Sequence, residues 1–160
     1  MASAGIFSGV NRDALLDSLR TTVAAVASLL LAGLLKMPES YWAPISTIVV
    51  VQSTIPPRTL AWQRFVGTAL GALLGAALAT FFSPNALGYA LGIFLCGVLA
   101  FLLRVGGAYR FAGIGLTIVW LIPHVSPPWI VGWHRFVQVS LGIAVALVVT
   151  TVWPLAKKTA

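Results

Sequence analysis

The sequence has little charge, and charge of one sign is almost missing. Asp, Glu, Lys and Arg make up 8% of its 160 residues, and only three residues are acidic. Soluble domains carry about 25% charged residues, because these keep the surface wetted. With 59% hydrophobic residues, a soluble fold of this length would expose large apolar patches. The composition therefore predicts a protein that lies in a lipid bilayer.

Other scarce residues exclude whole classes of function. The single cysteine, Cys96, excludes an internal disulfide framework and a cysteine-based metal site. The acids Asp13, Asp17 and Glu39 lie in the N-terminal segment and in one loop, so they form no catalytic pair and activate no nucleophile. Ten basic residues give a net charge of +7, but they form no stripe that would follow a nucleic acid. We therefore expect no enzyme, no metal or cofactor, and no nucleic-acid partner.

Uncharged stretches locate the expected membrane spans. The stretch 65–103 counts 39 residues, nearly twice what the roughly 30 Å hydrocarbon core requires, and Ser83-Pro84-Asn85 provide the turn that folds it back. We therefore expect an all-α integral membrane protein with six transmembrane helices, preceded by an interfacial segment at 1–13 and followed by a cytoplasmic tail at 155–160. The predicted helices cover residues 14–36, 41–55, 62–82, 86–104, 108–123 and 130–153.

The basic residues predict the orientation of these spans. With the N-terminus inside, eight of the ten Lys and Arg residues fall at cytoplasmic ends and two fall outside. Positive charge in short loops marks the cytoplasmic side, so both termini are expected in the cytoplasm of a bacterial-type inner (plasma) membrane. The eight are Arg12, Arg20, Arg58, Arg64, Arg104, Arg110, Lys157 and Lys158, and the two are Lys36 and Arg135.

An internal repeat divides the chain into two similar halves. Shifting the sequence by 71 positions aligns residues 56–71 with 127–142, and eight of the sixteen positions are identical, including two prolines and W-x-R-F-V-x-x-x-L-G. The shift predicts two three-helix repeats, at 14–82 and 83–154. Three spans are an odd number, so the second copy is expected to be inverted relative to the first, as in many transporter folds.

The predicted helices 41–55 and 108–123 are short and run into the double prolines Pro56-Pro57 and Pro127-Pro128. Short, proline-interrupted segments at corresponding positions of two halves point to a substrate site near the repeat interface. The alternative is that the prolines only end two helices that enter the membrane obliquely.

Two arginines of the repeat are the strongest candidates for binding a substrate. Arg64 and Arg135 each sit near the start of a span, with Trp62 or Trp133 two residues earlier. A guanidinium binds a carboxylate through paired hydrogen bonds, and a tryptophan stacks on an aromatic ring. The alternative is that both arginines extend to lipid headgroups beside interfacial tryptophans. We expect no carboxylate in the membrane region to neutralise either arginine, which favours binding of an anionic substrate or a lipid.

The remaining features carry weaker predictions. His124 and His134 flank the second double proline and are possible pH-sensing residues, but they do not form a metal site. Arg104 and Arg110 flank a turn and are expected to serve as topology charges. Small residues four apart, from Gly67 and from Gly88 onward, predict close helix packing. A module this small is expected to form a homo-oligomer, most simply a dimer.

The stretch 41–76 resembles the fusaric acid resistance protein-like family of aromatic acid exporters, to which plant aluminium-activated malate channels are related. The resemblance covers residues 14 to 154. The motifs that carry it are Tyr41-Trp42-Ala43-Pro44, Gln52, Arg64 followed by Gly67-Thr68 and Gly71, Trp133-x-Arg135 and Trp153-Pro154.

The resemblance implies a transporter that exports small organic anions, often aromatic carboxylic acids. It implies that Arg64 and Arg135 face the anion and that Trp42 and Gln52 line its path. Two alternatives stay open: a passive anion channel, and a non-transporting membrane subunit of a larger complex.

Overall fold

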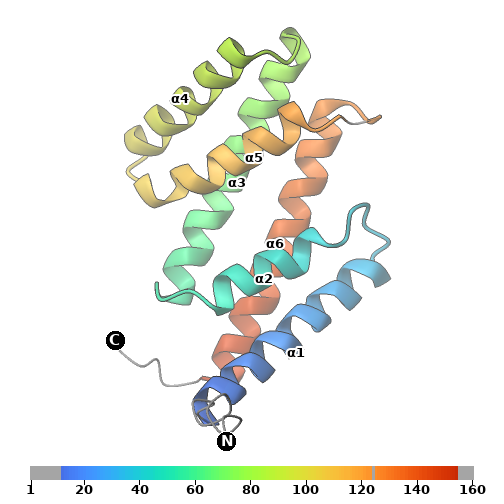
Figure 1. Ribbon diagram of the computed structural model, residues 1–160, viewed down its shortest axis with the longest axis vertical. Helices are drawn as coiled ribbons and strands as arrows, with labels where there is room; N and C mark the ends of the chain where they lie inside the picture. Colours follow the sequence, from blue (N-terminus) through green and yellow to red (C-terminus); the bar gives the residue numbers. More distant parts are fainter. Residues whose placement is uncertain (1–11, 124, 155–160) are drawn as a thin grey trace, which may run out of the picture.

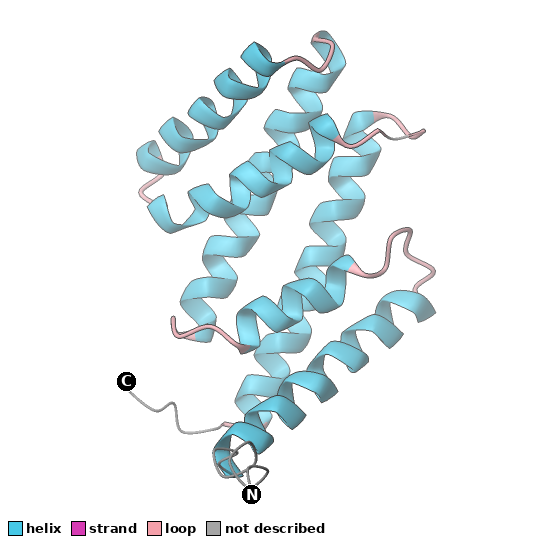
Figure 2. Cartoon of the chain, viewed as in Figure 1, coloured by secondary structure: helices cyan, strands magenta, loops and turns pink. Residues whose placement is uncertain are grey.

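The computed structural model describes residues 12–123 and 125–154, and every regular element within these ranges is helical (Figures 1 and 2). The predicted tail at 155–160 and most of the predicted interfacial segment at 1–13 lie outside the described residues. The elements are α1 (Arg12–Leu34), α2 (Trp42–Val51), α3 (Pro57–Phe81), α4 (Ala86–Leu102), the short 3-10 helix η1 (Gly106–Ala108), α5 (Tyr109–Leu121) and α6 (Pro128–Val152).

The helices differ in length. Within the described ranges, three helices are long and apolar enough to cross a membrane: α1 with 23 residues, and α3 and α6 with 25 residues each. The others are shorter, at 10 residues in α2, 17 in α4 and 13 in α5. At about 1.5 Å per residue, α2 reaches about half of the hydrocarbon core. The chain is therefore an all-α membrane protein with long and short helices in each half.

The double prolines begin helices and do not interrupt them. Pro57 and Pro128 each occupy the first turn of a long helix, where the missing N–H has no intrahelical partner to lose. The predicted starts at residues 62 and 130 are therefore too late. The predicted end of the second helix at residue 55 is also wrong, because α2 ends at Val51. Similarly, α5 ends at Leu121, since Ile122 precedes a proline and is extended.

Two long helices form the centre of the molecule. Figure 1 shows α3 and α6 side by side and running in opposite directions. α5 packs along α3, and α2 packs along α6. α4 lies against α5 and α3, as α1 lies against α2 and α6. Each helix of the first half thus has a counterpart in the second half with the equivalent neighbours.

The repeat continues in the close contacts between helices. A methyl group on Gly71 of α3 would collide with the carbonyl oxygen of Ala112 on α5, and one on Gly142 of α6 would collide with that of Ala43 on α2. Glycine therefore permits both crossings, as small residues do between membrane helices. The two glycines are 71 residues apart, whereas the two alanines are 69 apart. The sequence offset therefore changes between the long and the short helices.

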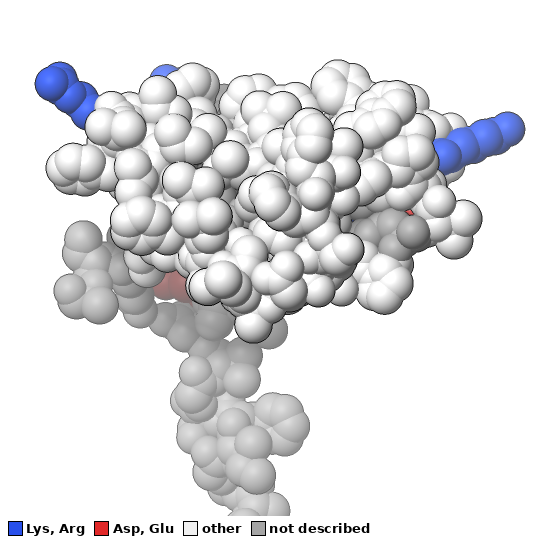
Figure 3. Space-filling view, turned by 90° about the horizontal axis from the view of Figure 1, so that it is seen from above, with Lys and Arg blue, Asp and Glu red and all other residues white. Residues whose placement is uncertain are grey.

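The outer surface is apolar. Figure 3 shows a face that is almost free of acidic and basic side chains, with Lys or Arg side chains extending from its edges. Large hydrophobic side chains are exposed on α1 and α4, among them Leu30 and Phe94. Cys96 is buried in a cluster with Leu116 and Trp120. Such a surface is suited to contact with lipid chains.

Candidate functional site

The candidate site is arranged around a pair of phenylalanines that correspond in the repeat. Phe65 of α3 and Phe136 of α6 lie with their ring centroids 4.9 Å apart. Trp62 packs on Phe65 at 6.3 Å, and Trp133 packs on Phe136 at 6.1 Å. The same motif therefore meets its own copy where the two central helices cross.

The two tryptophans of the motif point away from the arginines. Trp62 is 59% exposed and Trp133 is 62% exposed. Residues two positions apart do not share a face of a helix, so Arg64 and Arg135 turn into the protein while the indoles turn outward. A direct role of these two tryptophans in binding stays a prediction.

Arg64 lies about two turns inside α3, deeper than predicted, because the helix begins at Pro57. It is 8% exposed. Its Nη2 donates a hydrogen bond to Oγ of Ser46 on α2 at 3.2 Å, and its guanidinium carbon lies 5.1 Å from the ring centre of Phe111 on α5. Its Nε is buried without a hydrogen-bond partner. Within the described residues no carboxylate pairs with Arg64.

Arg135 has a similar place on α6 but a different partner. It is buried, and its guanidinium carbon lies 3.6 Å from the ring centre of Trp42. Its Nη2 donates to Oε2 of Glu39 at 3.2 Å. The expectation that no carboxylate neutralises either arginine is therefore wrong for Arg135. The sequence held a signal for this pair, because the predicted topology places both residues on the outer side.

Arg110 belongs to the surroundings of Arg64, although the sequence suggested only a topology charge. Its guanidinium carbon lies 4.7 Å from the ring centre of Phe111, so two arginines contact the same ring. Arg110 also lines a cavity of about 220 Å³ together with Gln52 and Phe111. No sequence signal indicated that Arg110, rather than Arg104, would lie beside Arg64, since both residues lie outside the repeated motif.

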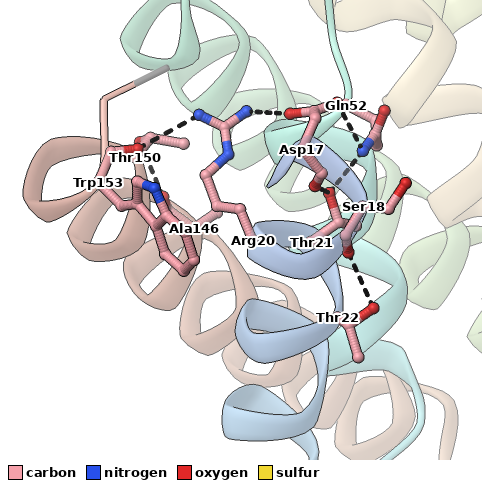
Figure 4. Close-up of polar contacts among 9 residues, drawn as sticks. All are labelled: Asp17, Ser18, Arg20, Thr21, Thr22, Gln52, Ala146, Thr150 and Trp153. Atoms are coloured by element: carbon pink, nitrogen blue, oxygen red, sulfur yellow. Dashed lines mark hydrogen bonds and ion pairs between the residues drawn. The ribbon is translucent and has the colours of Figure 1, made fainter. Parts of the chain in front are cut away.

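Besides lining this cavity, Gln52 takes part in a cluster of polar contacts, shown in Figure 4. Its amide donates to Oδ2 of Asp17 at 3.2 Å and to the hydroxyl of Thr21. Asp17 pairs with Arg20 at 2.6 Å, and Arg20 donates to the carbonyl oxygen of Trp153 at 3.4 Å. This polar cluster joins the start of α1 to the ends of α2 and α6, so Gln52 has a structural role beside any role in binding.

A second cavity of about 220 Å³ lies beside Arg135. His134, Glu39 and Gln138 also line it, and the amide of Gln138 donates to the carbonyl oxygen of Pro38. A pH-sensing role for His134 stays a prediction, and His124 lies outside the described residues. In the described part of the chain, no three His, Cys, Asp or Glu side chains are grouped as a metal site would require.

Comparison with known proteins places this chain in a family. The sequence profile described as fusaric acid resistance protein-like matches residues 24–149. The chain is also 31% identical over 147 residues to the inner membrane protein YeeA of Escherichia coli (strain K12), a match that covers 84% of this chain and 40% of that protein. The chain thus spans about two fifths of the length of this relative. No solved structure matches. With most of its length inside the profile, the chain belongs to the fusaric acid resistance protein-like family.

Proposed function

We propose that this chain is a secondary transporter that exports small organic anions, chiefly aromatic carboxylic acids. One observation carries the proposal: Arg64 and Arg135 occupy the same position of the repeated motif, both are buried, and each lies beside an aromatic ring. A guanidinium offers paired donors to a carboxylate, and an aromatic face accepts a ring. The family and the inner-membrane relative agree with transport across the inner membrane.

The architecture we propose is six spans in two inverted repeats, at residues 14–82 and 83–154, in which the short helices α2 and α5 cross together with the residues that flank them. Three observations support it. The helices α3 and α6 begin and end 71 residues apart, they run in opposite directions, and their neighbours correspond helix by helix. In such an arrangement Arg64 and Arg135 approach the pathway from opposite membrane faces.

The short helices α2 and α5 supply the partners of the two arginines. α2 carries Ser46 and Trp42, and α5 carries Phe111. Short segments at corresponding positions of inverted repeats form the substrate sites of many transporters. We place the pathway between these two helices, with both termini in the cytoplasm and two copies of the chain in a homodimer.

Flux in proteoliposomes tests the proposal. Vesicles that contain the purified protein and are loaded with unlabelled benzoate should take up labelled benzoate by counterflow, while protein-free vesicles should not. A voltage-driven benzoate current without a coupled ion would identify a passive channel. Absence of flux for benzoate and for other organic anions would refute transport by this chain and favour a non-transporting subunit.

A further inference from the structure

The loop between α1 and α2 holds a carboxylate against the Arg135 guanidinium. Lys36 and Glu39 in this loop have φ angles of 49° and 53°, in the left-handed region that residues with a side chain rarely adopt. Oε2 of Glu39 accepts hydrogen bonds from Nη2 of Arg135 and from Nε1 of Trp42, both at 3.2 Å. The strained loop therefore places a negative charge where the guanidinium and the indole meet.

This pairing leaves most of the Arg135 guanidinium without a partner. Nε and Nη1 of Arg135 are buried and make no hydrogen bond, although the side chain is only 3% exposed. A carboxylate usually satisfies an arginine with two parallel hydrogen bonds, whereas Glu39 reaches it through one. Glu39 is also 42% exposed, so solvent reaches its carboxylate.

The surroundings of Arg135 can hold a larger carboxylate than the one that Glu39 provides. The adjoining cavity of about 220 Å³ is lined by Gln138 and His134 beside Arg135 and Glu39. Trp42 lies against the guanidinium, whose carbon is 3.6 Å from the ring centre, so an aromatic side chain borders the cation. At the corresponding position in the first half, no carboxylate within the described residues pairs with Arg64. Of the two repeated arginines in the described residues, Arg135 is therefore the one that pairs with a carboxylate.

We infer that Arg135 and Trp42 form a binding site for an aromatic carboxylate, and that Glu39 occupies this site as a tethered competitor until a ligand displaces it. The inference rests on the proposed function and adds a residue that lies outside the repeated motif. Apparent affinity falls in proportion to the fraction of molecules whose site is free. If Glu39 covers the guanidinium in about nine molecules of ten, it weakens ligand binding about tenfold.

Replacing Glu39 by glutamine tests the inference. Glu39→Gln keeps the length of the side chain and removes its negative charge. Titration of benzoate into the purified protein, followed by calorimetry, should show binding about tenfold tighter than in the wild type. Benzamide, which has the same ring without the charge, should gain nothing. Asp13→Asn is the control, since Asp13 is exposed in the first turn of α1; it should leave benzoate affinity unchanged.

Removing Glu39 leaves the buried charge of Arg135 without its partner and is expected to destabilise the protein. Two further measurements therefore distinguish a change in binding from a loss of stability. Benzoate should raise the thermal unfolding midpoint of Glu39→Gln by more than that of the wild type, since the ligand replaces the missing carboxylate. Glu39→Asp keeps the charge on a shorter side chain, and its affinity should lie between those of the wild type and Glu39→Gln.

The outcomes separate this inference from the proposed function. If the wild type binds benzoate and Glu39→Gln binds it equally well or more weakly, Glu39 is not a tethered competitor. The proposed transport would still stand. No benzoate binding by either protein would overturn the proposed substrate class and this site together. A similar gain in Asp13→Asn would show a general effect of removing a negative charge and would also overturn the inference.

Discussion

Replacing Arg64 by lysine separates anion binding from lipid anchoring. The guanidinium of Arg64 is buried, donates to Ser46 and lies beside Phe111. Lysine keeps the charge but loses the planar fork that binds a carboxylate through two parallel bonds. We therefore expect Arg64→Lys to fold and to insert normally while it binds substrate poorly.

The size of the effect follows from the hydrogen bonds at stake. A hydrogen bond to a charged group contributes roughly 1.5–3 kcal/mol, and a factor of ten in affinity corresponds to about 1.4 kcal/mol. Loss of one bond of a bidentate pair should therefore raise the KM for benzoate about tenfold to a hundredfold. Arg64→Gln, which also removes the charge, should reduce flux further.

Benzoate counterflow in proteoliposomes with equal amounts of inserted protein measures this effect. Arg58→Lys is the control, because Arg58 lies exposed in the first turn of the same helix. It should transport like the wild type. A lysine extends to headgroups nearly as well as an arginine. Wild-type KM and rate in Arg64→Lys would therefore make Arg64 a lipid anchor and remove it from the site.

Three further predictions address packing, a second arginine and topology. Gly71→Ala should lower the free energy of unfolding in detergent by about 1–3 kcal/mol, because the added methyl group meets backbone atoms of α5. The control Gly33→Ala should not, because a methyl group there meets nothing within 4 Å. Equal unfolding midpoints of the two variants would contradict the close crossing of α3 and α5. Arg110→Gln should slow benzoate counterflow, since it removes one of the two cations beside Phe111; unchanged flux would return Arg110 to a topology charge. Reporters fused after Ala160 and inserted in the 83–85 turn should lie on opposite sides of the membrane, and matching sides would refute the six-span proposal.

The sequence predicted the helical class because helix formation depends on local residues, and the architecture of two inverted repeats stays a proposal. The identical positions in 56–71 and 127–142 fall in the first part of α3 and α6, and these helices keep the offset of 71 over their whole length. The helix starts were predicted too late because proline was treated as a break. It is equally suited to the first turn of a helix.

Contacts between distant residues were harder to predict. Arg135 and Glu39 are 96 positions apart. The predicted topology placed both on the outer side, but the repeat did not indicate the pair, because Arg64 has no such partner in the described residues. The short helices share no marked identity, so nothing in the sequence indicated that Ala43 and Ala112 correspond at an offset of 69. Such pairings depend on how helices cross, which a single sequence does not record.

The hydrogen bond from Arg64 to Ser46 has a mechanical consequence. α6 packs with α1 and α2, and α3 packs with α4 and α5, so each group of packed helices combines different halves of the chain. Arg64 on α3 and Ser46 on α2 belong to different groups, and their hydrogen bond adds a polar link to the packing of α3 against α6 that joins the groups. An anion that displaced Ser46 from the guanidinium would remove this bond and leave the packing of α3 on α6 to hold the two groups together. Binding would in this way loosen the coupling between the two groups of helices.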